Sequence, residues 1–381
     1  MSNDSPKPEP ANVDRRAFLG TAGAAAAGAL AGCSGPEAAG GAPAVITQPN
    51  VMWRIASSFP RSLEALFGSA ERLAQRLEVL TDGRFRMRAY PAGDLVPALQ
   101  VMDAAQQGTV QVGHTASYYY TGKNPALAFD TGVPFGLNSR QQDAWLYRGG
   151  GLELMQGVFA DFGLVTMPAG NTGAQMGGWF KREINSAAEL RGLNMRIPGL
   201  GGDVMDRLGV TVQVLASGDI YPALERGAID ATEWVGPADD EKLGFHRAAN
   251  FYYYPGWWEP GPSMSFMVNR AAWDQLPSGY QEAFRTAAVE AATSTITTYD
   301  AQNPAALQRL LSEGVQLRRF STEIMEAART AAEAILEEQA AADPTYANIH
   351  TQWKAFRDAA FGWFGTSEKA YAEFAFPVQA V

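Results

Sequence analysis

The sequence has 381 residues, too many for one compact core, so we expect two α/β domains. Its 30 Lys and Arg residues against 40 Asp and Glu residues give a net charge of -10. Binding to nucleic acid or to an anionic membrane needs a concentrated basic face, so this acidic balance argues against both partners. Any anion that the protein binds must be held by a local arrangement of side chains.

The first 33 residues are predicted to be an export signal and not part of the fold. Asp14-Arg15-Arg16-Ala17-Phe18-Leu19 precedes a stretch rich in Ala and Gly, with no further acidic residue before Glu37. A positive region, a weakly apolar region and small residues in that order are typical of secretion, and the adjacent arginines match the twin-arginine pattern. The chain is therefore predicted to be exported to the periplasm.

Cys33 is the only cysteine in the chain, which excludes a disulfide framework and a cysteine-based metal site. It follows Leu30-Ala31-Gly32, which resembles a bacterial lipobox, where the cysteine becomes the lipid-bearing first residue of the mature protein. Cleavage after another small residue, with Cys33 removed or incidental, is the alternative. Residues 34–47 are rich in Gly, Ala and Pro and are predicted to be a flexible tether.

From residue 48 onward, strand and helix patterns alternate. Apolar residues at spacings of two predict strands, and those at spacings of three and four predict helices. Strands are predicted over 51–56, 85–89, 110–113, 165–169, 194–197, 210–215 and 264–268. Helices are predicted over 62–80, 97–107, 186–190 and 201–208. This alternation indicates the α/β fold class.

One unit of helix, glycine and strand occurs twice, over residues 101–113 and 220–232, with Gly108 and Gly227 at equivalent places. Identity between the copies is low enough for chance, but two related lobes around a cleft would place the same unit on both sides. We therefore expect a two-lobed, type II-like periplasmic-binding-protein architecture with a ligand cleft between the lobes. The residues after each strand are expected to face that cleft.

The predicted domain I comprises 48–167 and about 260–300, and domain II comprises 168–259. Residues 301–381 are expected to form C-terminal helices that pack across the domains or on a dimer partner. Within the long alanine-rich helix that begins at Ser278, Asn303-Pro304 is predicted to kink or split the helix. Two further helices are predicted over 322–341 and 346–360, and their apolar faces need a surface to cover.

The stretch from Gly170 to Phe180, GNTGAQMGGWF, combines four glycines with amide, thioether and aromatic side chains. Such a segment lets the backbone approach a small molecule while a few side chains contact it. A turn into a buried strand explains the same residues equally well.

Two charged residues are also open to two interpretations. Arg196 lies in a predicted apolar strand, where its burial is costly without a partner. Its planar guanidinium suits a ligand carboxylate, and a structural salt bridge to an Asp or Glu is an equal alternative. Glu233 directly follows the second repeated unit and is either a site residue or a solvated acid at a strand end.

Together these motifs resemble the substrate-binding proteins of tripartite ATP-independent periplasmic (TRAP) transporters, DctP type. The resemblance covers nearly all of the chain from Val51 to the C-terminal helices. Its most specific motifs are GNTGAQMGGWF at 170–180, LRGL at 190–193 with Arg196, ATEWVGP at 231–237 and GWWE at 256–259. The chain is similar to the subgroup that binds 2-oxo or 2-hydroxy monocarboxylates together with a metal ion.

This resemblance implies a function and partners. The protein would be a receptor without enzymatic activity that closes over a pyruvate-like or lactate-like acid and delivers it to the TRAP membrane permease. Some relatives dimerise through their C-terminal helices, which fits the alanine-rich tail. In this family a long helix runs across both domains and flexes on closure, so Asn303-Pro304 is a departure from the pattern.

The resemblance also assigns roles to individual residues. Arg196 would clamp the ligand carboxylate, and the side-chain oxygens of Gln175 and Glu233 with the backbone carbonyl of Trp234 would hold the cation. Asn171 and Glu259 lie in matching motifs and are expected to contact the substrate. Oxygen ligands suit a hard cation such as Na⁺ or Ca²⁺, with Mg²⁺ as a further possibility, and disfavour zinc or copper.

Aromatic residues are expected around the same place. Trp179, Phe180, Trp257 and Trp258 either enclose the apolar end of the ligand or belong to the domain core. A hydroxyl from the other lobe is expected from one of Tyr118, Tyr119 and Tyr120.

Three alternatives remain beside the transport receptor. A metal-dependent lyase or hydrolase acting on 2-oxo acids could share an oxygen-rich site, although the sequence has no nucleophile elbow and no phosphate-binding Gly-x-x-x-x-Gly-Lys motif. A binding protein for a larger organic acid is the second alternative, and a purely structural lipoprotein is the third.

Overall fold

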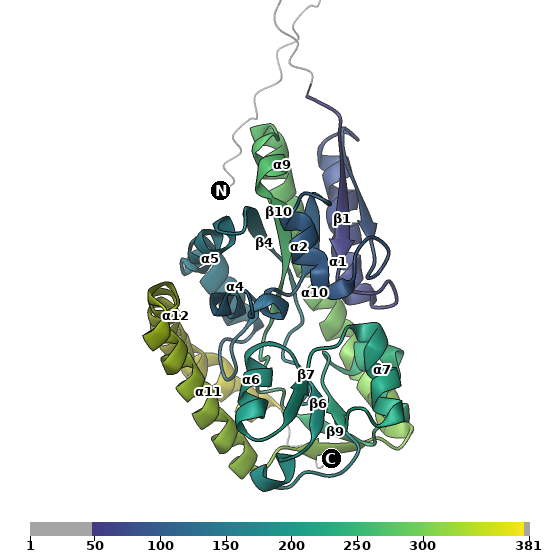
Figure 1. Ribbon diagram of the computed structural model, residues 1–381, viewed down its shortest axis with the longest axis vertical. Coiled ribbons are helices and arrows are strands. Elements are labelled where there is room, and N and C mark those ends of the chain that lie inside the picture. The colour runs from purple at the N-terminus through teal and green to yellow at the C-terminus, as the bar shows by residue number, and fades with distance from the viewer. Residues whose placement is uncertain (1–47, 377–381) are drawn as a thin grey trace, which may run out of the picture. The chain divides into compact units, whose positions relative to one another are not determined.

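Two β-sheets organise residues 48–376, the part of the chain that the computed structural model describes (Figure 1). The predicted export signal, Cys33 and the tether over 34–47 lie outside these residues. None of the helices in the described range is both long enough and apolar enough to span a membrane.

The first sheet has the strand order β2-β1-β3-β10-β4. Strand β1 is parallel to β2 and β3, whereas β10 is antiparallel to β3 and β4. The strands are β1 (Val51–Ser57), β2 (Phe85–Tyr90), β3 (Val112–Thr115), β4 (Leu164–Asn171) and β10 (Ser263–Asn269). Every residue of β3 and β4 is buried, as expected for strands covered on both faces.

The second sheet has the order β11-β9-β5-β8-β6-β7. Its strands are β5 (Trp179–Phe180), β6 (Asn194–Arg196), β7 (Thr211–Gln213), β8 (Ala231–Thr232), β9 (Phe251–Tyr254) and β11 (Gln316–Arg319). The chain thus passes from the first sheet to the second after β4 and returns after β9. The domain boundaries at 167/168 and 259/260 stay a prediction; 259/260 lies in the connection between β9 and β10, whereas 167/168 lies within β4.

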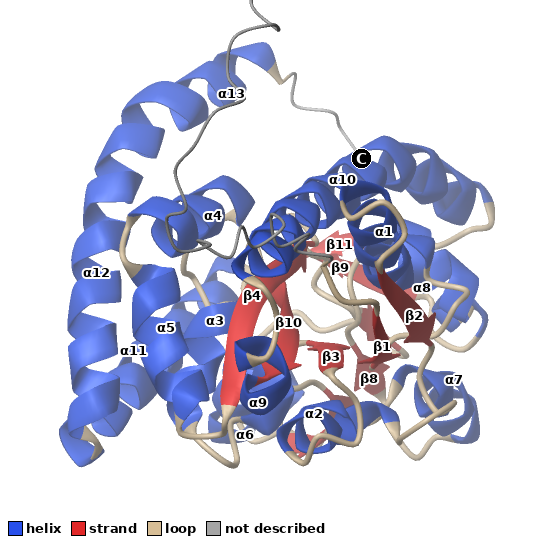
Figure 2. Cartoon of the chain, turned by 90° about the horizontal axis from the view of Figure 1, so that it is seen from above, coloured by secondary structure: helices blue, strands red, loops and turns tan. Residues whose placement is uncertain are grey.

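The helices cover the two sheets. Around the first sheet lie α1 (Glu64–Leu80), α2 (Val101–Gln106), α3 (Ala128–Thr131), α4 (Ser139–Arg148), α5 (Gly151–Ala160) and α9 (Arg270–Asp274). The second sheet is accompanied by α6 (Gly199–Arg207), α7 (Ser217–Arg226) and α8 (Pro237–Leu243). After them come α10 (Ser278–Ser312), α11 (Thr322–Ala342), α12 (Pro344–Phe364) and α13 (Ala370–Ala375). Figure 2 shows α10 lying beside α1, in agreement with their contacts.

The repeated unit predicted from the sequence is confirmed as a structural unit. Helix α2 is followed by Gly108 (φ +72°) and β3, and helix α7 by Gly227 (φ +77°) and β8. Each strand lies in the interior of its sheet, β3 between β1 and β10 and β8 between β5 and β6. The residues that follow these strands therefore leave the middle of each sheet.

Of the kink or split predicted at Asn303-Pro304, the split is wrong, because α10 is a single helix of 35 residues with Pro304 inside it, and the kink stays a prediction. Proline removes one backbone hydrogen bond and crowds the preceding turn, but the helix is held by packing on both sides of it. Tyr299 before the proline and Ala306 and Leu310 after it are all completely buried. Tertiary packing therefore keeps the helix in one piece.

The region after residue 301 contains a strand that the sequence reasoning did not predict. Strand β11 pairs in parallel with β9 and forms one edge of the second sheet. Helices α4, α5 and α8 and strand β9 are also absent from the predicted elements, and the predicted helix over 186–190 is a short 3-10 helix. Among the predicted strands, β3 lies two residues later than predicted, and β7 is shorter than the predicted 210–215.

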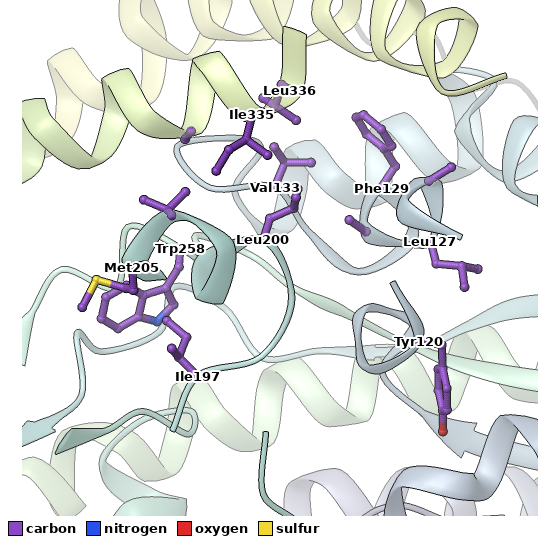
Figure 3. Close-up of a cluster of buried hydrophobic side chains, with 14 of the residues drawn as sticks. Tyr120, Leu127, Phe129, Val133, Ile197, Leu200, Met205, Trp258, Ile335 and Leu336 are labelled. Carbon is purple, nitrogen blue, oxygen red and sulfur yellow. The ribbon is translucent and has the colours of Figure 1, made fainter. Parts of the chain in front are cut away.

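The C-terminal helices contact helices that cover both sheets. Helix α11 packs against α6, and α12 packs against α11 and α4. Figure 3 shows Ile335 and Leu336 of α11 directed toward Leu200 of α6 and Val133, all within one buried cluster. Helix α12 begins at a strong signal, because Pro344 occupies its first turn and the side chain of Asp343 accepts a hydrogen bond from the Tyr346 N–H at 2.7 Å.

Candidate functional site

Backbone hydrogen bonds join three segments that the sequence reasoning had singled out. The Gln175 N–H donates to the Glu259 carbonyl at 3.2 Å, and the Gly256 N–H donates to the Gln175 carbonyl at 2.9 Å. The Met176 N–H donates to the Val235 carbonyl at 2.9 Å. The stretches 170–180, 231–237 and 256–259 are therefore brought together by the chain's own backbone.

Gly178 allows two of these stretches to approach closely. It has a φ of +83°, and a Cβ atom there would lie 2.5 Å from the Thr232 carbonyl oxygen and 3.2 Å from the Cα of Glu233. A side chain would therefore both strain the backbone and push Glu233 away. Glycine at this position sets the distance between the glycine-rich stretch and Glu233.

Arg196 and Glu233 form a buried ion pair, with side chains 1% and 0% exposed. The Arg196 Nη1 donates to the Glu233 carboxylate and, at 2.9 Å, to the Glu233 backbone carbonyl. Its Nε donates to the Leu215 carbonyl at 3.2 Å, and the guanidinium carbon lies 5.0 Å from the centre of the Trp234 ring. The structural salt bridge is therefore present.

One N–H donor of Arg196 and several oxygen acceptors of the same three segments have no hydrogen-bond partner in the described part of the chain. Among the described residues, the buried Arg196 Nη2, Gln175 Oε1, Glu233 Oε2 and Glu259 Oε2 have no hydrogen-bond partner. Buried polar atoms without partners are unfavourable and rare in native proteins. Three oxygens without donors suit a cation, and a guanidinium nitrogen without an acceptor suits a carboxylate.

Within residues 48–376, no cluster of three or more His, Cys, Asp or Glu side chains could hold a metal ion. The oxygen set found here is of another kind, because it combines two carboxylates with an amide oxygen. Such mixed oxygen ligands fit Na⁺ or Ca²⁺ better than a transition metal.

The pKa values of Glu233 and Glu259 also favour a bound cation. Burial raises the pKa of Glu233 to about 7, even though Arg196 acts to lower it. Burial also raises the pKa of Glu259 well above its ordinary value, and the charge of Glu233 raises it further. The local charge is therefore more negative than the environment tolerates, and a bound cation would relieve it.

The three tyrosines after β3 separate into two kinds. Burial raises the pKa values of Tyr118 and Tyr119, and the charges of Glu259 and Glu233 raise both further. Tyr120 instead uses its hydroxyl within the core, accepting from the Met102 N–H at 3.1 Å and lying 3.2 Å from Thr115 Oγ1. Of the three tyrosines, Tyr118 and Tyr119 therefore remain the candidates for the hydroxyl expected from the other lobe.

Asn171 lies close to the site in sequence, but its amide is already engaged. Its Nδ2 donates to the Gly261 carbonyl at 2.9 Å, and its Oδ1 accepts from the Gly173 N–H at 2.9 Å. The side chain therefore shapes the loop that carries Gln175.

For Trp179 and Phe180, the core interpretation holds. Trp179 stacks on Tyr252 with ring centres 4.0 Å apart, and Phe180 packs on Tyr253 and Phe320. Trp257 stacks on Phe135, 5.2 Å away, and Trp258 packs on Trp257 and Phe320.

Asp240 is an important residue that the sequence reasoning missed. Its buried carboxylate accepts from the Trp179 Nε1 at 3.0 Å, the Tyr252 hydroxyl at 2.7 Å and the Val235 N–H at 3.3 Å. It therefore fastens the segment after Glu233 to β5 and β9. The only signal in the sequence is its place in the acidic pair Asp239-Asp240, which follows Gly236-Pro237-Ala238.

Comparison with known proteins gives a family and solved relatives. The sequence model of the family DctP, bacterial extracellular solute-binding protein, family 7, matches residues 56–343. A monocarboxylate 2-oxoacid-binding periplasmic protein of Nostoc sp. is 58% identical over 327 residues, which cover 86% of this chain and 90% of that protein.

Two crystal structures are also similar. A TRAP transporter solute binding protein from Bordetella bronchiseptica is 47% identical with a TM-score of 0.85, over 86% of this chain and 98% of that one. It is a mixed-occupancy dimer, with copurified calcium and picolinate in one active site and an apo site. A TRAP periplasmic solute binding protein from Colwellia psychrerythraea, with bound calcium and pyruvate, is 39% identical with a TM-score of 0.83, over 85% and 99%.

Proposed function

The chain belongs to the DctP family of bacterial extracellular solute-binding proteins, and we propose that its solute is a small 2-oxo or 2-hydroxy monocarboxylate bound together with a cation. The family is one of transport receptors and not of enzymes. The observation that carries the proposal is the unpartnered Arg196 Nη2 beside three unpartnered buried oxygens.

Each group then has a role. Arg196 binds the ligand carboxylate through Nη2 while its Nη1 stays on Glu233. Gln175, Glu233 and the backbone carbonyl of Trp234 hold the cation, and Glu259 supplies a further carboxylate beside it. A 2-oxo or 2-hydroxy oxygen of the ligand completes the coordination, which a plain carboxylate cannot do.

Similar proteins support this choice of ligand. The Nostoc relative is a binding protein for monocarboxylate 2-oxoacids, and the Colwellia protein contains calcium and pyruvate. A protein from Pseudoalteromonas atlantica, also 39% identical, contains sodium and pyruvate. Either Na⁺ or Ca²⁺ therefore fits the proposed site.

We further propose that the ligand is held between the two lobes and is delivered to a TRAP membrane permease. Tyr118 and Tyr119 follow a strand of the first sheet, whereas Arg196 and Glu233 belong to the second sheet. A ligand that contacts both groups stabilises the closed state because those contacts differ between open and closed forms.

Calorimetric titration tests the proposal. Pyruvate and lactate are expected to bind in the presence of Ca²⁺ or Na⁺, with affinity at least about tenfold weaker after chelation or for acetate, which lacks the second oxygen. A size series of 2-oxo acids tests the alternative of a larger organic acid. Ligand that NMR shows to be chemically changed would favour the lyase or hydrolase, and the absence of binding to every acid would contradict the proposal.

For export, we propose the twin-arginine route and lipid attachment at Cys33. Replacing Arg15-Arg16 with two lysines should keep the protein in the cytoplasm. Cys33→Ser should move it from the membrane fraction to the soluble periplasmic fraction. A Cys33→Ser protein that stays with the membrane would contradict lipid attachment at this residue.

We also propose a homodimer through the C-terminal helices. Aromatic side chains are exposed near the end of the chain, with Trp363 64%, Tyr371 67% and Phe374 93% accessible. Such a group of exposed aromatics suits an interface between chains, and the Bordetella relative is a dimer. Light scattering should give the mass of a dimer for the whole chain and of a monomer after Phe374→Glu; a monomeric wild type would contradict the proposal.

A further inference from the structure

Asn303 belongs to the motif Asn303-Pro304, which has no role in the proposed site. It lies on a stripe of residues along one face of α10. Thr295, Tyr299 and Asn303 are four residues apart, so they face the same side of the helix, one turn above another. All three contact segments that lead into or out of the proposed site.

Two of these residues hold the start of α8. The Tyr299 hydroxyl donates to Asp239 Oδ2 at 2.7 Å, and the Ala238 N–H donates to Asn303 Oδ1 at 3.0 Å. The first N–H groups of a helix have no partner within the helix, and α8 has no side-chain cap of its own. Asn303 therefore caps α8 from a different helix.

The start of α8 is separated from the proposed cation ligands by a very short connection. Glu233 and Trp234 follow β8 directly, and α8 begins at Pro237. A displacement of the first turn of α8 is therefore expected to displace the Trp234 carbonyl and the Glu233 carboxylate.

The same stripe contacts the other ligand-bearing segment. Gly170, with φ +148°, lies so close to α10 that a Cβ atom there would be 2.6 Å from Thr295 Oγ1. A Cβ atom on Gly173 would be 3.2 Å from Cδ1 of Ile296, next to the stripe. Gln175 follows two residues later, so α10 lies against the loop that carries it.

We propose that Tyr299 and Asn303 are positioning residues that hold Glu233 and the Trp234 carbonyl in the arrangement that the cation requires. This inference rests on the proposed cation and carboxylate site. This role explains the polar side chains of Tyr299 and Asn303 in a long helix beside Pro304. The amide oxygen of Asn303 accepts a hydrogen bond from α8 and not from its own helix. The hydrogen bonds pre-organise the site, so their loss weakens cation binding even where no ligand contact is removed.

The long helix itself provides a matched control. Tyr280 and Tyr299 are both buried tyrosines of α10, and each donates one hydrogen bond from its hydroxyl. The Tyr280 hydroxyl donates to the Pro49 carbonyl at 2.9 Å, away from the proposed site. Tyr280→Phe and Tyr299→Phe therefore remove the same atom, although the Tyr299 hydroxyl bonds a buried carboxylate and the Tyr280 hydroxyl a backbone carbonyl. Only the second substitution touches the segment after Trp234.

The experiment measures Ca²⁺ affinity in the presence of pyruvate, together with unfolding in urea, for wild type and variants. Tyr299→Phe is expected to lose more stability than Tyr280→Phe, because it leaves the buried Asp239 carboxylate without this donor; Ca²⁺ affinity is therefore compared where both variants are folded. Tyr299→Phe should weaken Ca²⁺ binding by about five- to tenfold, the usual scale for a lost capping hydrogen bond, whereas Tyr280→Phe should change it by less than about twofold. Asn303→Ala should weaken it similarly, and Asn303→Asp, which keeps an acceptor oxygen, should restore it.

The possible failures are distinguishable. Wild-type protein that binds neither Ca²⁺ nor pyruvate would overturn the proposed function and this inference with it. A wild type that binds normally, with Tyr299→Phe and Tyr280→Phe equal in Ca²⁺ affinity, would overturn the positioning role alone.

Discussion

Replacing Arg196 with alanine should damage both stability and binding, and the two effects can be separated. The Arg196 and Glu233 side chains are 1% and 0% exposed, so their charges are almost fully removed from water. Removing one partner of a buried ion pair leaves the other charge uncompensated and costs about 3–5 kcal/mol. That loss is a large part of the roughly 5–15 kcal/mol that stabilises a typical protein domain.

A second substitution isolates the cause. Glu233→Gln removes the remaining charge, so the double variant Arg196→Ala with Glu233→Gln should regain at least about half of the stability that Arg196→Ala loses. It should not regain ligand binding, because the guanidinium that we assign to the carboxylate is still missing. The recovered stability thus belongs to the ion pair, whereas the lost binding of the double variant combines the missing guanidinium with the lost charge of Glu233, a proposed cation ligand.

Urea unfolding followed by tryptophan fluorescence, with calorimetric titration of pyruvate and Ca²⁺, measures both quantities on the same proteins. Arg196→Ala with wild-type stability would refute the argument about the buried pair. Binding of pyruvate to the double variant with wild-type affinity would refute the role of Arg196 as the carboxylate clamp.

Two other predictions concern stability. Burial raises the pKa of Asp130 from 3.8 to about 6, so the folded protein holds this proton more tightly than the unfolded chain; unfolding free energy should therefore fall by about 3 kcal/mol as pH rises from about 4 to about 7. Asp130→Asn should remove that part of the pH dependence in urea titrations, and an unchanged slope would argue against it. Gly178→Ala should destabilise the protein by at least about 2 kcal/mol more than Gly163→Ala, because both positions have positive φ but only at Gly178 would the added Cβ atom lie 2.5 Å from a backbone oxygen, that of Thr232. Equal losses of unfolding free energy in the two variants would show that backbone strain alone matters at Gly178.

The sequence predicted the α/β class and the repeated unit well, because both depend on local periodicity and on glycine at helix ends. It could not tell which residues of the stretch from Gly170 to Phe180 face a ligand and which are buried in the core. Gln175 is assigned to the proposed site and Gly178 lies against Glu233, whereas Trp179 and Phe180 belong to the core, since the two-residue strand β5 is buried between β8 and β9. Which residues of a short strand face a ligand depends on its neighbours in the sheet, and these come from distant parts of the chain.

Long-range packing also explains the elements that were mispredicted. Pro304 is a helix breaker in local terms, but the buried Tyr299 and Leu310 keep α10 continuous. Strand β11, with the sequence QLRR, has no apolar alternation and forms because it pairs with β9. Local propensity has little weight in either case.

Arg196 shows a different limit of sequence reasoning. The ligand clamp and the structural salt bridge were treated as alternatives of equal weight, yet one guanidinium has donors enough for both. In the structure Nη1 and Nε are used within the protein and Nη2 is not. A planar group with several donors can serve stability and recognition together, and only coordinates divide the donors between them.

The position of β11 has a consequence for how the chain is synthesised. Because β11 forms the outer edge of the second sheet beside β9, that sheet is incomplete until residue 319 has left the ribosome. Until then the aromatic strand Phe251–Tyr254 is an open edge, of the kind that pairs with other chains and aggregates. A nascent or truncated chain that ends before β11 is therefore expected to aggregate more readily than a chain that includes residues 316–319.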